Sequence, residues 1–240
     1  MSLPDEPGVD PRTGGPTGHD GPHAFVADLE TPELAGEDHH HLARALRLRP
    51  GDPLTVSDGR GRWRTARFAE LPEPSGPIHT VEEPIEPVTI GFTPVKGDRP
   101  EWTARRLTEL GVDRIWVLQS DRSVVKWAGD RGEKQLERLT KVTREASMQS
   151  RRVWLPELEL VGRAVDVMGR AGAVAADRSG RAPTRDDQTI LIGPEGGWSP
   201  TELVVAAATI VLGEQVLRAE TAALAAATLA VALRGRLVGG

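Results

Sequence analysis

The amino-acid sequence predicts an α/β protein in two parts, a small β-rich domain followed by a larger domain with a mostly parallel sheet. The first observation is a series of short apolar runs separated by turn residues over residues 23–87, which is typical of a small β domain. The second is a change of rhythm after Pro87, where short apolar runs alternate with segments of helical periodicity. Strands that alternate with helices favour a parallel sheet covered by helices.

The N-terminal third is expected to contain an arm, a β-rich domain and a linker. Residues 1–22 are rich in Pro, Gly and Asp and have few large apolar side chains, so we expect a disordered acidic arm. Residues 23–87 are predicted to form the β-rich domain, with a hairpin at Asp58-Gly59 and a short helix near residues 38–47. The segment 82–87, rich in proline and glutamate, is interpreted as the linker.

Residues 88–240 are expected to form the larger domain. Short apolar runs provide its strand candidates, at residues 88–92, 114–118, 172–176, 189–193 and 209–213. Apolar residues recur at helical spacing over 133–149, and the alanine-rich segment 219–233 predicts a closing helix. Ser199 and Glu202 have the spacing of a capping box, so another helix is predicted to begin there.

The composition excludes several kinds of site. The chain has no cysteine, which excludes disulfides, thiolate metal sites and cysteine nucleophiles and fits a cytoplasmic protein. No apolar stretch reaches the roughly eighteen residues of a transmembrane helix, and the acidic N-terminus is unlike a secretory signal. His39, His40 and His41 are consecutive, so in a helix they cannot all bind one ion. We therefore expect no metal and no membrane partner.

The charge is unevenly distributed. The net charge is −5, yet residues 1–40 alone carry −8, which leaves about +3 on residues 41–240. Two stretches are basic: residues 41–67 hold seven arginines against two aspartates, and residues 121–152 hold nine basic against five acidic residues. Because local basic patches set the attraction to phosphates, these stretches are candidates for RNA contact.

The strongest local signals for a ligand site are two strand-to-helix connections. The segment Leu191–Ser199 reads LIGPEGGWS, and its glycines permit close approach of a ligand to the backbone. The segment 211–222 reads VLGEQVLRAETA and places Glu220 and Thr221 at the start of a helix. Neither segment fits a dinucleotide or phosphate-loop pattern, and each alone is compatible with an ordinary turn. Ligands of open α/β sheets bind at the carboxyl ends of strands, where both segments are expected.

Taken together, the two segments resemble the knotted SPOUT class of RNA methyltransferases. Within that class they resemble the ribosomal RNA small subunit methyltransferase E family, which methylates N3 of a uridine in 16S ribosomal RNA. Other matching motifs are His40-His-Leu42, Ala45-Leu-Arg47, Pro50-Gly-Asp52, Glu109-Leu-Gly-Val112, Arg122-Ser-Val-Val125, Glu145-Ala146, Gln149-Ser150, Arg152 and Pro156. The resemblance covers about residues 23–235. Asp121 departs from the family pattern, which usually has a glutamate there.

The resemblance implies a fold, a cofactor and partners. The N-terminal domain would be a PUA-like β-barrel that binds RNA, and the C-terminal domain would carry a trefoil knot, an exception to the rule that chains do not thread. The knot loops would hold S-adenosylmethionine. The enzyme would be a homodimer, and its partner would be 16S ribosomal RNA, within the 30S subunit.

The resemblance also assigns residues. The cofactor is expected to contact Leu191, Ile192, Gly193, Pro194, Glu195, Gly196, Gly197, Leu212, Gly213, Val216, Leu217, Thr221 and Ala222. Contacts to RNA are expected from Arg44, Arg47, Arg49, Arg122, Lys126, Lys141, Arg144, Gln149 and Arg152. Arg218 would stabilise negative charge on the uracil oxygens. The general base would be Glu195, Glu220 or a water that they hold. Alternatively, Arg218 pairs with Glu220 or Glu214 and only holds the loop.

Two other classes of protein are compatible with the sequence. The first is a non-catalytic RNA-binding or ribosome-assembly protein with a vestigial knot domain, against which the intact glycines and the residues Arg218, Glu220 and Thr221 count. The second is a nucleotide-dependent enzyme with a doubly wound sheet, against which the missing fingerprints count.

Overall fold

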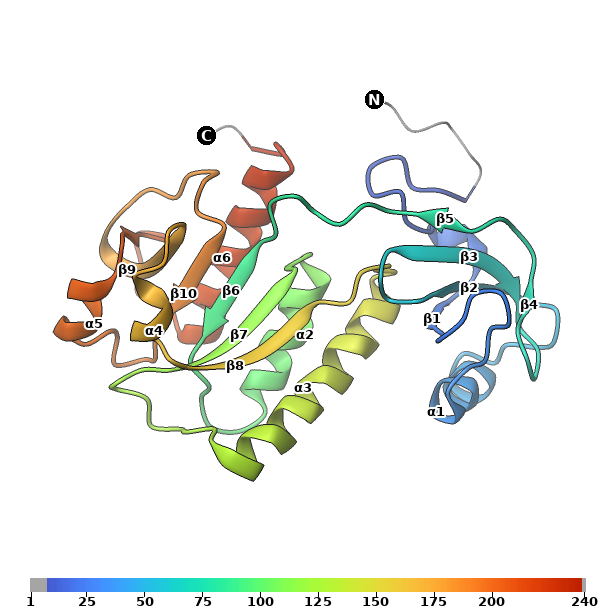
Figure 1. Ribbon diagram of the computed structural model, residues 1–240, viewed down its shortest axis with the longest axis horizontal. Helices are drawn as coiled ribbons and strands as arrows, with labels where there is room; N and C mark the ends of the chain where they lie inside the picture. The colour runs from blue at the N-terminus through green and yellow to red at the C-terminus, as the bar shows by residue number, and fades with distance from the viewer. Residues whose placement is uncertain (1–7, 239–240) are drawn as a thin grey trace. The chain divides into compact units, whose positions relative to one another are not determined.

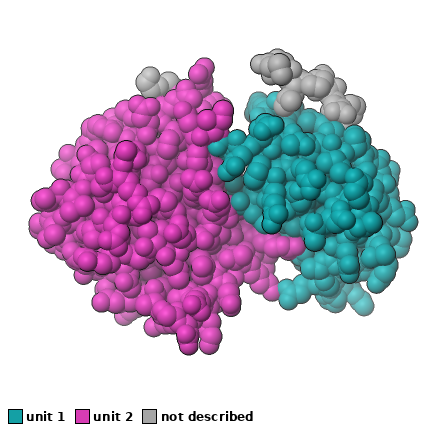
Figure 2. Space-filling view, in the orientation of Figure 1, with its two compact units in different colours: residues 1–84, 147–155 teal, residues 85–146, 156–240 magenta. Residues whose placement is uncertain are grey.

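The computed structural model describes residues 8–238, which divide into two compact units (Figure 2). The first unit comprises Met1–Pro84 and Ser147–Leu155, and the second comprises Ile85–Ala146 and Pro156–Gly240. The expectation of disorder over residues 1–22 lies outside the described residues for residues 1–7. Residues 8–22 contain a bridge between Val9 and Pro16 and a short 3₁₀ helix.

The first unit is built on a five-stranded sheet (Figure 1). Its elements are β1 (His23–Phe25), α1 (Gly36–His40), a π-helical turn (His41–Ala45), β2 (Pro53–Ser57), β3 (Arg62–Arg67), β4 (Glu73–Pro74) and β5 (His79–Thr80). The strand order is β1-β2-β3-β4, and β5 also pairs with β3. These pairings, among the described residues, do not close the sheet. Its core contains Leu42, Leu54 and Phe68, so the short helix predicted near residues 38–47 packs on the sheet.

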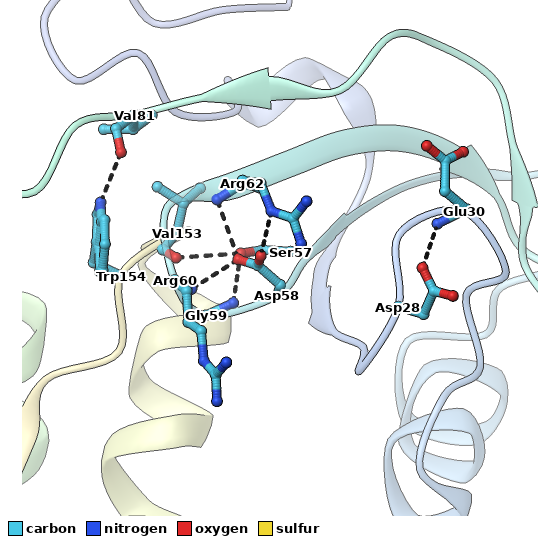
Figure 3. A network of polar contacts seen from close by, with 10 residues as sticks. All are labelled: Asp28, Glu30, Ser57, Asp58, Gly59, Arg60, Arg62, Val81, Val153 and Trp154. Carbon is cyan, nitrogen blue, oxygen red and sulfur yellow. Dashed lines mark hydrogen bonds and ion pairs between the residues drawn. The ribbon is translucent and has the colours of Figure 1, made fainter.

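The predicted hairpin at Asp58-Gly59 is confirmed by the antiparallel pairing of β2 with β3. Figure 3 shows how the turn is held: Asp58 accepts hydrogen bonds from the backbone N–H of Arg60 at 2.8 Å and from Nε of Arg62 at 2.8 Å. Gly59 has φ +71°, a conformation that side chains with a Cβ rarely adopt. The dipeptide is therefore suited both to the turn geometry and to its hydrogen bonds.

Residues 147–155 belong to the first unit although they follow the elements of the second in sequence. The backbone carbonyl of Val153 accepts hydrogen bonds from Ser57 Oγ at 3.3 Å and from the N–H of Gly61 at 3.0 Å. Trp154 Nε1 donates to the carbonyl of Val81 at 3.0 Å (Figure 3). The range 23–87 predicted for the β-rich domain does not include this segment, since pairing between distant segments leaves no local pattern in the sequence.

The second unit is organised around a six-stranded parallel sheet (Figure 1). Its elements are β6 (Thr89–Phe92), α2 (Arg99–Glu109), β7 (Arg114–Gln119), α3 (Gly129–Gln149), β8 (Glu157–Arg163), α4 (Val165–Met168), β9 (Ala173–Arg181), β10 (Thr189–Ile192), α5 (Pro200–Val205), β11 (Thr209–Ile210) and α6 (Ala219–Arg234). The strand order is β11-β9-β10-β6-β7-β8. The predicted mostly parallel α/β sheet is confirmed. The edge strand β8 was not predicted because it is only partly buried and has no continuous apolar run.

Helices pack on both faces of this sheet. On one face, Ile190 and Ile192 of β10 join a core that includes Leu107 of α2 and Ala223 of α6. On the opposite face, Leu191 packs in a second cluster with residues of α4 and with Trp198. This alternation follows from the strand geometry, in which successive side chains point to opposite faces.

The start of α5 agrees with its sequence signal. At α5, the hydroxyl of Ser199 accepts a hydrogen bond from the N–H of Glu202, and the Glu202 carboxylate accepts one from the N–H of Ser199, so the predicted capping box is confirmed. No helix within residues 8–238 is long and apolar enough to cross a membrane.

Candidate active site

A pocket of about 370 Å³ lies at the carboxyl ends of β10 and β11 and beside the middle of β9. It is lined by Ala176, Asp177, Arg178, Ile192, Gly193, Pro194, Glu195, Gly196, Gly197, Trp198, Val211, Leu212, Gly213, Gln215, Val216, Leu217, Ala219 and Ala222. The walls come from the two loops predicted from the sequence and from the middle of the neighbouring strand β9. The lining is apolar apart from backbone groups and a few charged side chains, which is typical of a small-molecule site.

Most of the residues expected to bind the cofactor line this pocket. The two exceptions are Leu191, which is fully buried against the sheet's second core, and Thr221, which is exposed on the first turn of α6. Leu191 points away because it alternates with Ile192 along β10. The structure therefore brings together the segments Ile192–Gly197 and Leu212–Leu217 and adds Ala222 from α6.

The contribution of β9 was not predicted from the sequence. Ala176, Asp177 and Arg178 line the pocket because β9 pairs with both β10 and β11. Trp198 Nε1 donates a hydrogen bond to the carbonyl of Ala176 at 3.1 Å. This bond holds the glycine-rich loop, residues Gly193–Gly197, against β9. The one available signal was the end of the apolar run at Ala176, because parallel strands present their carboxyl ends at the same sheet edge.

Two glycines leave room for a ligand in this pocket, and a third packs closely on a neighbouring ring. A Cβ added to Gly213 would meet no atom within 4 Å, and the same holds at Gly197, whose φ of +67° already favours glycine. A Cβ on Gly193 would lie 3.1 Å from the ring of Trp198, so glycine there permits close packing under the pocket floor. The loop thus presents backbone rather than side chains to the pocket.

The loop that follows β7 is fastened to the glycine-rich loop. Arg122 Nη1 donates a hydrogen bond to the carbonyl of Gly196 at 2.8 Å. The N–H of Asp121 donates to Glu202 Oε1 at 3.0 Å, and Asp121 Oδ2 accepts a hydrogen bond from Ser199 Oγ at 2.7 Å. Glu202 is almost fully buried, and these bonds together with the capping box satisfy its carboxylate.

The two candidate carboxylates of the site share one cation. Arg99, the first residue of α2, has its Nη1 3.5 Å from Glu195 Oε1 and 3.8 Å from Glu220 Oε1. The side chain of Glu195 is 53% exposed, whereas that of Glu220 is 15% exposed. Arg99 was not predicted from the sequence, because nothing local indicates that the starts of α2 and α6 lie together with the loop after β10.

Arg218 is the N-cap residue of α6 and is exposed. It stands between Leu217 and Ala219, which both line the pocket. Among the described residues no ion pair involves its guanidinium, and the partner of Glu220 is Arg99. Pairing of Arg218 with Glu220 or Glu214 is therefore not what the structure describes.

The side chains expected to contact RNA occur in both units. In the first unit Arg44, Arg47, Arg49 and Gln149 are exposed, and Arg152 is half-buried. In the second unit Arg122, Lys126 and Lys141 are exposed, and Arg144 is half-buried. Arg122 differs from the rest, since its guanidinium already bonds the glycine-rich loop.

The consecutive histidines lie in α1 and in the turn that follows it. The ring of His39 stacks on Phe68 at a centroid distance of 5.0 Å and lies 4.0 Å from the carboxylate of Glu70. Over residues 8–238, no group of three or more His, Asp or Glu side chains is placed to hold a metal ion.

Comparison with known proteins gives matches along most of the chain. Residues 81–231 match the family model of an RNA methyltransferase domain, and residues 34–75 match that of an RNA methyltransferase PUA domain. A protein of Mycobacterium bovis named ribosomal RNA small subunit methyltransferase E is 32% identical over 214 residues, which cover 78% of this chain and 81% of the relative.

Solved structures agree with the sequence relatives. A ribosomal RNA small subunit methyltransferase E from Neisseria gonorrhoeae, bound to S-adenosyl methionine, is 25% identical, with a TM-score of 0.73 over 90% of this chain and 99% of that one. A probable rRNA methyltransferase from Porphyromonas gingivalis is 28% identical, with a TM-score of 0.71 over 90% of this chain and 100% of that one.

The parallel sheet, the pocket at its carboxyl edge and the matched models define the class of the protein, an RNA methyltransferase domain with a PUA-like N-terminal domain. Within that class, the chain belongs to the ribosomal RNA small subunit methyltransferase E family. The resemblance stated from the sequence is thereby confirmed.

Proposed function

We propose that this protein transfers a methyl group from S-adenosylmethionine to N3 of a uridine in 16S ribosomal RNA. The observation that carries the proposal is the pocket formed by Gly193–Gly197 and Leu212–Leu217 at the carboxyl edge of the sheet. Family membership supports it, as does the cofactor named for the relative from Neisseria gonorrhoeae. The trefoil knot, which the resemblance implies, stays a prediction.

The residues of the pocket fit such a cofactor. Leu212, Leu217 and Ala222 provide apolar walls suited to an adenine ring, and open space beside Gly197 and Gly213 leaves backbone groups accessible to hydrogen-bonding atoms. When bound, S-adenosylmethionine supplies a methyl group that is activated by its sulfonium. The chain itself then has to bind the cofactor and the RNA, hold N3 of the base about 3–3.5 Å from the methyl carbon and remove the proton from N3.

Removal of the proton from N3 of uridine is the main chemical task of the side chains. N3 of uridine is a weak acid, and its neutral form is a poor nucleophile. A general base must therefore take the N3 proton before or as the bond to carbon forms. Glu195, Glu220 or a water that they hold fills this role, and Arg218 stabilises the negative charge that develops on the uracil oxygens. Both carboxylates lie beside Arg99, and Glu195 lines the pocket.

The RNA is held by phosphate contacts. Exposed basic side chains attract phosphates, Arg44 and Arg47 in the first unit and Lys126 in the second. The substrate is 16S ribosomal RNA within the 30S subunit, which places the protein in the cytoplasm. The target base has to leave its stack to reach the pocket, at an energetic cost of about a few kcal/mol.

A homodimer completes the proposal. Besides its buried face, α6 leaves Thr228 exposed and Leu224, Ala225 and Leu229 half-buried, so a second copy has an apolar helix surface to cover. Light scattering at micromolar protein checks this, and a mass near 26 kDa would argue for a monomer.

The decisive experiment is mass spectrometry of ribosomal RNA from cells that lack the protein. We expect one uridine of 16S RNA to lose a methyl group at N3 and to regain it when the gene is restored. RNA unchanged by the deletion would reject the activity. The alternative, an RNA-binding protein without catalysis, predicts in addition that calorimetry detects no binding of S-adenosylmethionine.

A further inference from the structure

A second, much smaller cavity adjoins the cofactor pocket. It measures about 10 Å³ and is lined by Phe92, Thr93, Val95, Pro100, Thr103, Ala219 and Glu220. Ala219 also lines the large pocket, so the two cavities share this residue at the start of α6. A cavity of this size has room for about one water molecule.

Two buried oxygens belong to residues that line this small cavity, the niche. Thr93 is 1% exposed, and its Oγ1 has no hydrogen-bond partner among the described residues. The same is true of Glu220 Oε2, which is also buried. Buried polar atoms in folded proteins almost always have a partner, either protein or ordered water. Two such atoms from residues around one water-sized cavity therefore point to a water site.

Arg99 fixes which oxygen of Glu220 is available. Its guanidinium faces Oε1 at 3.8 Å, which leaves Oε2 to the niche. Arg99 also faces Glu195, and the other residues that line the niche are uncharged. Glu195 is more than half exposed, whereas Glu220 is largely shielded from solvent.

We infer that Thr93 and Glu220 hold a water molecule that removes the proton of the substrate nitrogen, with Arg99 as the residue that positions Glu220. This inference rests on the proposed function and chooses one base among its candidates. The hydroxyl of Thr93 donates to the water oxygen, and the water donates to Glu220 Oε2. The N3–H bond breaks, the proton passes to the water, and the water returns a proton to the carboxylate. Nitrogen keeps the electron pair and bonds to the methyl carbon, while the pair of the broken C–S bond stays on sulfur.

The pH profile of Glu220→Gln tests the role of the carboxylate. In single-turnover experiments with saturating RNA and cofactor, we expect the wild-type rate constant to reach a plateau near neutral pH, because the carboxylate takes the proton of the uncharged uracil. Glu220→Gln should lower the rate by roughly 10²–10⁴-fold and remove this plateau, so that its rate keeps rising with pH as the uracil imide ionises by itself. Glu195→Gln is the matched exchange, and it should keep the plateau. Loss of the plateau in Glu195→Gln and its retention in Glu220→Gln would overturn the inference.

The hydroxyl of Thr93 is tested by exchanges that keep the side-chain shape. Thr93→Val should lower the single-turnover rate about fivefold to tenfold, the effect of one hydrogen bond, and Thr93→Ser should restore it. Thr89→Val makes the same exchange at the other end of β6, at another buried threonine, and should leave the rate unchanged. Because Oγ1 of Thr93 has no partner within residues 8–238, its removal should not weaken the fold, so a stability loss with an unchanged rate would count against the inference.

A crystal structure supplies a measurement independent of activity. We expect density for one ordered water within hydrogen-bond distance of Thr93 Oγ1 and Glu220 Oε2, and its loss in Thr93→Val. A dry niche would overturn the inference even for an active enzyme. If instead the wild-type protein methylates no uridine, the proposed function fails, and the crystallographic result separates that failure from the present one.

Discussion

The hydroxyl of Ser199 donates a 2.7 Å hydrogen bond to Asp121 Oδ2, and this contact joins the loop after β7 to the N-cap of α5. The N–H of Asp121 completes the link through Glu202. The glycine-rich loop runs directly into this cap, so its conformation depends on a residue outside the pocket. The resemblance implies a glutamate at this position, and the shorter Asp121 reaches Ser199.

Asp121→Ala should therefore weaken cofactor binding, although Asp121 does not line the pocket. A hydrogen bond to a charged group contributes about 1.5–3 kcal/mol, and the exposure of Asp121 places it toward the lower end. We expect roughly a tenfold rise in the Kd for S-adenosylmethionine by calorimetry. Asp186→Ala is the control, since that exposed aspartate makes no side-chain hydrogen bond among the described residues. Equal affinities in the two variants would contradict the link.

Gly213→Val should block the pocket while the fold persists. Its φ lies outside the left-handed region, and a Cβ there meets no atom within 4 Å, so the added side chain enters the space proposed for the cofactor. We expect no measurable binding of S-adenosylmethionine by calorimetry and an unchanged unfolding midpoint. Gly18→Val repeats the exchange at an open glycine outside the pocket and should bind as the wild type does. Normal affinity in a folded Gly213→Val variant would remove this loop from the site.

His23 makes the first unit sensitive to acid. Burial, and then the charge of Arg151, lower the pKa of His23 from 6.5 to about 3, while its Nδ1 shares a 2.9 Å hydrogen bond with Thr55 Oγ1. Between these two pH values the unfolded chain binds a proton that the folded chain does not, so stability is full above pH 6.5 and falls as the pH is lowered. The slope from this one group is about 1.4 kcal/mol per pH unit. Urea unfolding from pH 7 to pH 4.5 should show a steeper loss for the wild type than for His23→Gln. Parallel pH dependences would contradict the assignment.

The sequence predicts the buried strands and the glycine-rich loops better than it predicts the edge strand. The apolar runs at β6, β7 and β10 are continuous because both faces of a parallel strand are buried, so they stand out in the sequence. The edge strand β8 is solvated and has no such run. The glycine-rich loops are recognisable because their conformation and their contact with a ligand both demand particular residues.

Contacts between distant segments leave no local pattern. Nothing near Arg99 in the sequence indicates that it faces Glu195 and Glu220, since the starts of α2 and α6 meet only when both helices pack on the same sheet face. For the same reason the lining residue Asp177 was not predicted. Residue types therefore indicate which groups can react, while packing decides which of them lie together.

Lys126→Ala should weaken RNA binding by removing a phosphate contact. Lys126 is exposed in the loop before α3, and a lysine that neutralises one phosphate contributes about one unit to the slope of log affinity against log salt. We expect a higher KM for RNA, a smaller salt slope, and an unchanged rate at saturating RNA. Lys96→Ala removes a lysine outside the expected RNA contacts and should keep the wild-type slope. The same slope in Lys126→Ala would exclude the phosphate contact.

Arg218→Ala should act on the chemical step rather than on binding. Arg218 is exposed, follows a pocket-lining residue and has no ion pair among the described residues, so its guanidinium is available to a substrate. If it stabilises charge on the uracil oxygens, its loss should lower the single-turnover rate at saturating RNA and cofactor by about 10²-fold or more, with little change in either affinity. Arg218→Lys keeps the charge but not the planar fork and should recover part of the rate. A structural role predicts the reverse pattern, a lower unfolding midpoint and weaker cofactor binding with a normal rate at saturation. A folded, saturated Arg218→Ala enzyme that methylates at the wild-type rate would therefore leave the uracil oxygens to another donor.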